Sequence, residues 1–89
     1  MAAVTPLELY VIQKVKKERL LRSISQDKLS LLMGLSKKFV SKVENINRTE
    51  KYNLNHLNKI AAVFNCSMRD LIPEKPMIAP IEEVERVIH

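Results

Sequence analysis

Apolar residues recur along the first quarter of the chain with the spacing of a helix. Leu7, Val11 and Val15 follow one another at intervals of four, which places them on one helical face. Thr5 precedes this stripe as a candidate N-cap, with a proline next and a glutamate three residues on, which is the pattern of a capping box. The pattern therefore predicts a helix that begins after Thr5 and runs to about Arg22.

A second, shorter helix is predicted after a polar break. Ser25 is a candidate N-cap, and Leu29 and Leu32 would form the buried face. Gly34, the only glycine of the chain, follows this apolar run and is typical of a left-handed C-cap. We expect the second helix to end there.

A third helix is expected almost at once, from Lys37 to about Asn45, behind a Ser36 cap. Val40 and Val43 would face the core. The positions left for solvent or a ligand carry basic and hydroxyl groups: Lys37, Lys38, Ser41 and Lys42. Two short helices joined by a tight turn, the second with an exposed basic side, indicate a helix-turn-helix, which sets its second helix in the DNA major groove.

Two further helices complete the domain. Residues 46–52 are polar and aperiodic, which indicates a loop, and Asn53 can cap a fourth helix. The apolar positions of that helix follow three-and-four spacing: Leu54, Leu57, Ile60, Ala61 and Phe64. Met68 to Ile72 is expected to form a fifth short helix that Pro73 stops.

We therefore predict an all-α fold, a compact bundle of five short helices, with a helix-turn-helix DNA-binding domain over residues 5–73. Residues 74–89 would be a proline-containing C-terminal extension. Its apolar residues are too many for a purely solvated tail: Met77, Ile78, Ile81, Val84, Val87 and Ile88. They would fold back on the domain or pair with a second copy. We favour a dimer, because helix-turn-helix proteins commonly bind two half-sites.

The composition fits one small domain, with 89 residues of which 46% are apolar and 28% charged. One glycine argues against a strand-rich fold, and one cysteine argues against a disulfide framework or a thiolate zinc site. The first residues do not resemble a signal peptide, and no stretch approaches the roughly 20 apolar residues of a membrane span. We expect a cytoplasmic protein.

The net charge of +5 is unevenly distributed. Residues 14–51 hold eleven Lys or Arg against four Asp or Glu, and residues 52–89 hold four against five. A basic half beside a near-neutral half suggests a polyanionic partner on one face. The alternative is that the basic residues only keep the domain soluble.

A set of residues at fixed spacings runs through most of the chain: Arg19, Ser25, Gln26, Leu29, Gly34, Leu35, Ser36, Val40, Ser41, Val43, Glu44, Leu57, Ile60, Ala61, Asp70 and Leu71. Over roughly residues 7–73 this pattern resembles the lambda-repressor-like (Cro/XRE-type) helix-turn-helix family. One position departs from it. The family usually has a glycine two residues after the glutamate, and this chain has Ile46 there, in a slightly longer loop.

The resemblance implies a DNA-binding role for several side chains. Gln26 would contact a backbone phosphate, at a helix N-terminus that also favours an anion. Lys37, Lys38 and Lys42 would reach base edges, where lysine can donate to guanine, or would touch phosphates only. Phe39 would meet a thymine methyl or a sugar, or instead close the edge of the core.

Asn45 and Arg48 are expected to contact phosphate by the same resemblance, the alternative being a solvated loop. The candidate DNA-binding residues are therefore Ser25, Gln26, Ser36, Lys37, Lys38, Phe39, Ser41, Lys42, Asn45 and Arg48. Arg19 and Glu44 would form a salt bridge between the first helix and the end of the third, which is a structural role.

Residues that could carry catalysis are few. His56 has no acid or cysteine at metal-ligand spacing, so we interpret it as a surface or partly buried residue, and Cys66 as a buried structural thiol. No enzyme activity, cofactor or metal is predicted. We expect sequence-specific binding of double-stranded DNA by a homodimeric bacterial or phage transcription regulator, most simply a repressor. The alternatives are an antitoxin-type or restriction–modification controller with a protein partner, and an interaction module without DNA binding.

Overall fold

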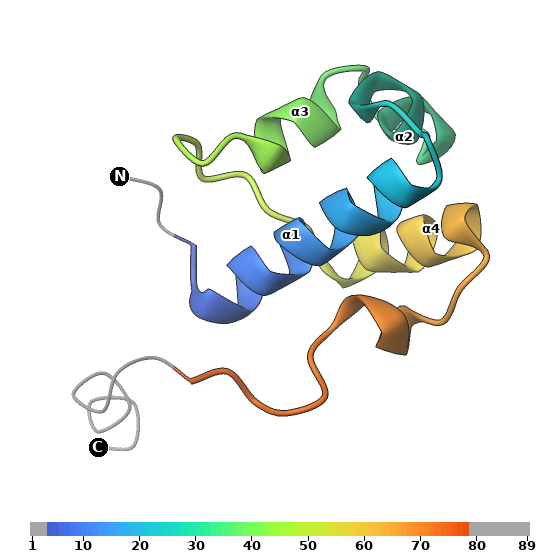
Figure 1. Ribbon diagram of the computed structural model, residues 1–89. Helices are drawn as coiled ribbons and strands as arrows, with labels where there is room; N and C mark the ends of the chain where they lie inside the picture. The colour runs from blue at the N-terminus through green and yellow to red at the C-terminus, as the bar shows by residue number, and fades with distance from the viewer. Residues whose placement is uncertain (1–3, 79–89) are drawn as a thin grey trace.

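The computed structural model describes residues 4–78 of the chain, and within them it contains helices and no strand. The elements are α1 (Pro6–Leu21), α2 (Gln26–Leu32), α3 (Phe39–Glu44), α4 (Leu54–Phe64) and the 3-10 turn η1 (Met68–Leu71) (Figure 1). The all-α prediction is confirmed, with four α-helices and one 3-10 turn in place of five helices. No helix among these has the length and apolar character that a bilayer crossing requires.

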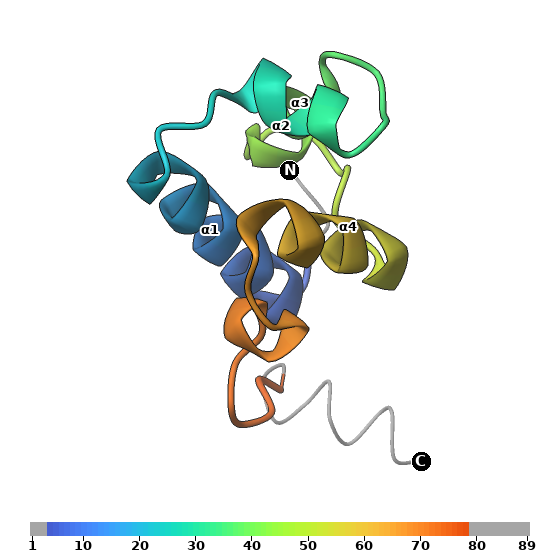
Figure 2. The same cartoon turned by 90° about the vertical axis from the view of Figure 1, so that its right-hand side faces the viewer.

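The helix α1 lies at the centre of the bundle and contacts α3, α4 and η1. α2 and α3 pack mainly on each other and form one end of the molecule, while η1 and the chain that follows it lie at the opposite end (Figures 1 and 2). The helix-turn-helix thus stands as a separate layer on a platform made by α1 and α4.

Every element contributes one fully buried aliphatic side chain to the core. These five residues are Val15, Leu29, Val40, Ile60 and Leu71, each at 0% exposure. Burying an aliphatic side chain of this size contributes about 1.5–3 kcal/mol. The platform and the helix-turn-helix therefore share one hydrophobic core.

Three leucines expected on buried faces are exposed instead. Leu32 is 49% exposed, because the buried side of α2 runs from Leu29 to Met33, at a spacing of four. Leu7 and Leu54 are 42% and 75% exposed, since each lies in the first turn of its helix, before the core begins. Leu7 and Leu54 together line a shallow groove of about 260 Å³.

The predicted N-caps of three helices are confirmed. Thr5 and Glu8 form the capping box of α1, with Thr5 N–H donating to the Glu8 carboxylate (2.9 Å) and Glu8 N–H donating to Thr5 Oγ1 (3.1 Å). Ser25 Oγ accepts from Lys28 N–H at 3.0 Å. Asn53 caps α4 in the same way. Such caps contribute about 1 kcal/mol each.

Left-handed residues end α1, α2 and α4. Ser23, Gly34 and Asn65 have φ angles of 55°, 76° and 54°. At the end of α2, the Gly34 amide donates to the Leu31 carbonyl (2.9 Å) and the next amide donates to the Ser30 carbonyl (3.0 Å). This pairing is a Schellman motif, so the C-cap predicted at Gly34 is confirmed.

The predicted start of α3 was wrong. Ser36 does not cap the helix, which begins at Phe39, and the Ser36 carbonyl instead accepts from Phe39 N–H in a turn (3.0 Å). The N–H of Val40 is satisfied from α2, because it donates to the buried Ser30 Oγ at 2.9 Å, and that hydroxyl donates to the Gln26 carbonyl at 3.0 Å. An acceptor from the preceding helix replaces a local cap, so residues 36–38 are not helical.

The fifth element was also predicted too long. It is a single 3-10 turn that ends at Leu71, and Ile72 is extended, with φ −121° and ψ 156°. Pro73 explains this conformation, because a proline disfavours the helical region for the residue before it.

Candidate nucleic-acid interface

The exposed side of the α2–α3 unit carries lysines, whereas its other side is buried in the core. The Lys37 and Lys38 side chains are 64% and 65% exposed and stand just before α3. Lys42 is also exposed and lies on α3, four residues after Lys38, which is the N-cap residue of that helix. Three lysines therefore point away from the core on one short segment.

A single carboxylate lies against this lysine group. Asp27, in the first turn of α2, is 3.4 Å from Lys38 Nζ and 3.9 Å from Lys37 Nζ. The three side chains bridge α2 and α3, and two positive charges share one negative charge. Asp27 was not among the expected site residues, because an eleven-residue separation follows no local periodicity.

The other charged groups of residues 14–51 are mostly paired on or beside α1. Glu18 binds Lys14 (3.4 Å) and Arg22 (2.8 Å), and the hydrogen bond from Arg22 lowers the pKa of this carboxyl. Glu8 binds Lys51 at 3.2 Å. Four lysines of this segment have no ion pair to another described residue: Lys16, Lys17, Lys28 and Lys42. Two of these four belong to the helix-turn-helix, so positive charge remains on that unit.

The predicted Arg19–Glu44 salt bridge is confirmed. Arg19 Nε donates to Glu44 Oε2 (3.0 Å) and Nη2 donates to Oε1 (2.8 Å), while Nη1 donates to the Ile24 carbonyl (2.8 Å). The two side chains are only 6% and 2% exposed. Glu44 also accepts from Gln26 Nε2 at 2.9 Å. The predicted phosphate anchor is therefore held in position by the buried pair, and its phosphate contact stays a prediction.

The three candidate serines lie around the same unit. Ser25 is the exposed N-cap of α2, and Ser36 is exposed in the turn before α3. Ser41 Oγ donates to the Lys38 carbonyl at 2.9 Å. These hydroxyl groups thus belong to the same α2–α3 unit as the lysines, and contacts from them to DNA stay predictions.

Asn45 and Arg48, on the loop after α3, have partners of their own. Arg48 forms a two-bond pair with Glu50 (2.9 and 2.7 Å), whose hydrogen bonds lower the pKa of Glu50 to about 2, so this carboxylate is ionised at neutral pH. Asn45 Oδ1 accepts from Asn47 N–H at 2.9 Å. A phosphate contact by Arg48 would compete with Glu50, so the charge available from this loop is smaller than the sequence suggests.

Phe39 packs in an aromatic cluster at the edge of the core. Its ring centroid is 4.7 Å from that of His56 and 6.0 Å from that of Tyr52. This is the core-edge role that was one of its two alternatives, and its contact with DNA stays a prediction. The Tyr52 hydroxyl is buried without a hydrogen-bond partner in the described part of the chain, and burial raises its pKa.

His56 has a structural role as the second member of the α4 capping box. Its ring Nδ1 accepts from the backbone N–H of Asn53 at 3.0 Å, and the backbone N–H of His56 donates to Asn53 Oδ1 at 2.8 Å. Burial, followed by the charge of Lys59, lowers the pKa of His56, which favours the neutral imidazole that this bond requires. Asparagine with a histidine three residues on was a signal that the sequence offered and that we interpreted only as a lone histidine.

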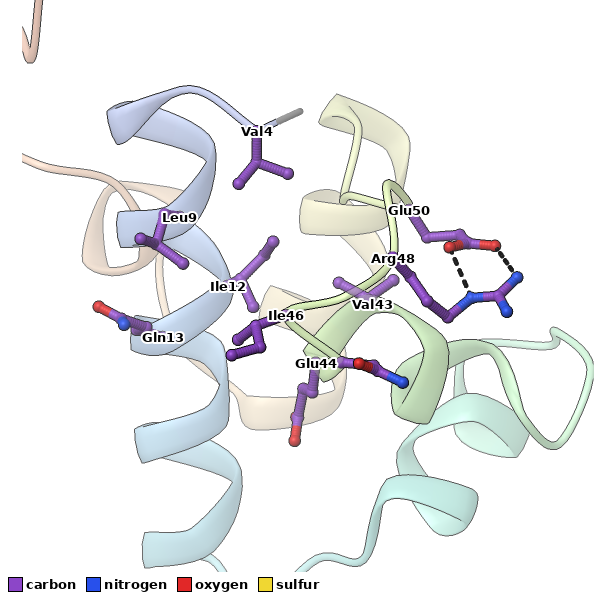
Figure 3. A pocket seen from close by; sticks show the side chains of 10 residues that line it. Val4, Leu9, Ile12, Gln13, Val43, Glu44, Ile46, Arg48 and Glu50 are labelled. Carbon is purple, nitrogen blue, oxygen red and sulfur yellow. Dashed lines mark hydrogen bonds and ion pairs between the residues drawn. The ribbon is translucent and has the colours of Figure 1, made fainter. Parts of the chain in front are cut away.

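A pocket of about 400 Å³ lies between α1 and the loop after α3. Figure 3 shows apolar side chains of α1 on one side of it and the Arg48–Glu50 pair on the other. Its charged groups, Glu44, Arg48 and Glu50, are all in ion pairs. Within residues 4–78 no three side chains gather as metal ligands, and burial raises the pKa of the Cys66 thiol. This pocket therefore presents no unpaired acid, base or nucleophile.

The geometry of the α2–α3 unit defines a helix-turn-helix DNA-binding domain. The model of the Cro/C1-type HTH DNA-binding domain family matches residues 14–74, and the chain belongs to that family. Its members are DNA-binding transcription regulators, and this is the class of function of the chain. A comparison with curated protein sequences gives no match.

Solved structures of two regulators are similar to the chain. The restriction-modification controller protein C.AhdI from Aeromonas hydrophila is 27% identical, with a TM-score of 0.60 over 71% of this chain and 92% of that one. The N-terminal DNA binding domain of SinR from Bacillus subtilis is 27% identical, with a TM-score of 0.60 over 75% and 96%. The complex of SinR with SinI gives 26% identity and a TM-score of 0.61 over 88% and 75%.

Proposed function

We propose that the chain binds double-stranded DNA in a sequence-specific manner and represses transcription by occupying a promoter. The observation that supports this most directly is the group of exposed lysines at positions 37, 38 and 42. The first two lie in the turn just before α3 and the third lies on α3, whose opposite side, Val40 and Val43, is buried in the core. A rigid helix with exposed donors on one side suits entry into the major groove. Occupancy alone blocks polymerase, so this mechanism requires no catalytic group and no cofactor.

The lysines and Gln26 would make different contacts with DNA. Lys37, Lys38 and Lys42 would donate to guanine O6 and N7 or to flanking phosphates, and only the first kind of contact carries sequence information. Gln26 lies at the N-terminus of α2, and one hydrogen of its amide is already bound to buried Glu44. A fixed amide at a helix N-terminus is suited to anchor a phosphate and so to set the register of α3 on the duplex.

We further propose that the active form is a homodimer in the bacterial cytoplasm, where the DNA lies. One helix-turn-helix covers a single half-site, and two copies would place their α3 helices about 34 Å apart, one turn of DNA. Most of the predicted dimer segment, residues 79–89, lies outside the described residues. Deleting residues 77–89 tests that segment, and sedimentation would show a shift from dimer to monomer. An unchanged oligomeric state would refute its role.

Selection of binding sites from a random duplex pool at about 0.15 M salt tests the function, because weak non-specific contacts are screened there. We expect enrichment of an inverted repeat with half-sites about one helical turn apart. Enrichment should be lost in a Lys37→Met, Lys38→Met double variant and kept in Lys75→Met. Lys75 belongs to the segment that follows η1, and this segment lies at the end of the molecule opposite α2 and α3 (Figure 1). If the wild-type protein retains DNA without an enriched sequence, the lysines contact phosphates only.

A second candidate is a regulator that works with a protein partner, such as an antitoxin or a restriction–modification controller. Its support is the likeness to SinR in a complex with SinI and to the controller C.AhdI. The chain also exposes apolar side chains near the ends of α1 and α2: Leu20, Leu21, Leu31 and Leu32, at 57%, 69%, 57% and 49% exposure. Failure to retain any DNA would favour a partner protein over DNA binding.

A further inference from the structure

Asp27 is the only acidic residue between Arg19 and Val43, and it lies within the proposed DNA-binding surface. Its side chain is 35% exposed and contacts two lysines that are expected to reach DNA. The other nearby carboxylate, Glu44, is buried and bound to Arg19. Asp27 therefore supplies the one solvent-exposed negative charge of the described α2–α3 unit.

We propose that Asp27 determines how strongly this protein discriminates its own site from other DNA. This inference rests on the proposed DNA-binding function and adds a residue to it. The Asp27 carboxylate holds Lys37 and Lys38 in ion pairs and repels phosphates, so DNA that offers only phosphates binds weakly.

The geometry gives this role its physical basis. The ion pairs are long, with Lys38 Nζ at 3.4 Å and Lys37 Nζ at 3.9 Å from the carboxylate, and both lysines are about two-thirds exposed. Pairs of this kind are weak and exchange with solvent, so a better acceptor can take the lysines. A contact with a phosphate away from Asp27 requires the lysine to leave the carboxylate, whereas a contact with a nearby base edge can use another of the three lysine N–H groups.

Specific and non-specific DNA differ in whether they take a lysine away from Asp27. At a matching site, a lysine donates to base acceptors and keeps its pair with Asp27 through another of its three N–H groups. On unrelated DNA it gains only the diffuse attraction of phosphates, and the carboxylate opposes that attraction. Removing the carboxylate charge should therefore strengthen non-specific binding more than specific binding.

The test compares Asp27→Asn with Glu74→Gln, which removes the same charge from an exposed position after η1. The segment that follows η1 lies at the end of the molecule opposite α2 and α3 (Figure 1). Dissociation constants are measured for the selected site and for an unrelated duplex of equal length. One additional phosphate contact at about 0.15 M salt tightens binding by about five-fold and steepens the log–log salt slope by about 0.9. We expect these changes for Asp27→Asn on unrelated DNA, and a change below about two-fold on the selected site.

A triple variant separates the effect of the ion pairs from the repulsion of phosphates by the carboxylate. If Asp27 acts mainly through the lysines, the effect of Asp27→Asn should be much smaller in a Lys37→Met, Lys38→Met background, where only that repulsion remains. An undiminished effect there would overturn the role assigned to the ion pairs. Melting curves of all variants show whether the fold is kept.

The outcomes also distinguish this inference from the proposed DNA-binding function on which it rests. The inference alone is overturned if the wild-type protein selects a site but Asp27→Asn keeps the ratio of its affinities for the selected and unrelated duplexes. The same holds if Asp27→Asn changes that ratio no more than Glu74→Gln does. A wild-type protein that binds every duplex equally overturns both.

Discussion

Glu44 and Asp27 both belong to the helix-turn-helix, and each carboxylate contacts two other side chains, but Glu44 lies in the core and Asp27 at the surface. Glu44 is bound by an arginine and a glutamine at 2.8–3.0 Å and is 2% exposed. Asp27 is bound by two lysines at 3.4–3.9 Å and is 35% exposed. The first network fixes how α3 lies on α1, and the second leaves its lysines able to change partners.

This difference shows that similar ionic chemistry serves stability in one place and recognition in another. A buried pair that loses one partner leaves an uncompensated charge in the core, at a cost of about 3–5 kcal/mol. An exposed pair is worth about 0–1 kcal/mol, so its loss is hardly felt by the fold. Variants in the two networks should therefore separate folding from binding.

The largest effect is expected from Glu44→Ala in the buried network. This substitution leaves the buried Arg19 guanidinium without its carboxylate and removes the acceptor of the Gln26 amide. The melting temperature should therefore fall by about 15 °C or more, and DNA binding should weaken with it. Thermal denaturation followed by circular dichroism measures the first effect, and a binding titration measures the second. Glu74→Ala is the control, and a melting curve like that of the control would refute the structural assignment.

The next effect is expected from Lys38→Met in the exposed network. Affinity for the selected site should fall about 10-fold or more, whereas the free energy of unfolding should change by less than about 0.5 kcal/mol. Titration by fluorescence anisotropy and a chemical denaturation curve give the two values, with Lys75→Met as the matched control. A large loss of stability without loss of affinity would reverse the roles of the two networks.

A smaller effect is expected from Tyr52→Phe, close to the buried network. Burial and the charge of Glu44 raise the pKa of Tyr52, and its hydroxyl makes no hydrogen bond to a described residue. Removing this hydroxyl should leave stability unchanged or raise it by up to about 1 kcal/mol. Urea denaturation measures the change, and a clear destabilisation would mean that the hydroxyl has a partner.

The smallest effect concerns pH and the aromatic cluster. Burial lowers the pKa of His56 in the folded protein below its unfolded value near 6.5, so the contribution of neutral His56 is present above that value and is lost as pH falls through the folded pKa. The melting temperature should drop by about 2 °C between pH 7 and pH 5 through this residue, since the ring is partly exposed. His56→Gln should remove that part of the pH dependence, and an unchanged pH profile would contradict the assignment.

The sequence was informative where structure depends on neighbours along the chain. The caps at Thr5, Ser25 and Asn53 and the turn at Gly34 depend on residues a few positions away, and all four were predicted. The family pattern added the long-range Arg19–Glu44 pair. These features fix the bundle and the place of the helix-turn-helix within it.

Tertiary contacts decided the remaining features. The start of α3 depends on Ser30 of the previous helix, which supplies the acceptor that Ser36 was expected to supply. The exposure of Leu54 depends on where the core ends, which the spacing of apolar residues does not encode. In the candidate site, Asp27 meets Lys38 only because α2 folds back on α3.

The three helix ends built on Ser23, Gly34 and Asn65 share one backbone handedness, but only one of them uses a residue without a side chain. A Cβ placed on Gly34 would meet nothing within 4 Å, so chirality, and not space, disfavours a residue with a side chain in the turn between α2 and α3. A D-alanine at this position would satisfy both conditions. Mirror-image chemistry at one atom could therefore stiffen the turn that presents the lysines, with every side chain of the DNA-binding surface unchanged.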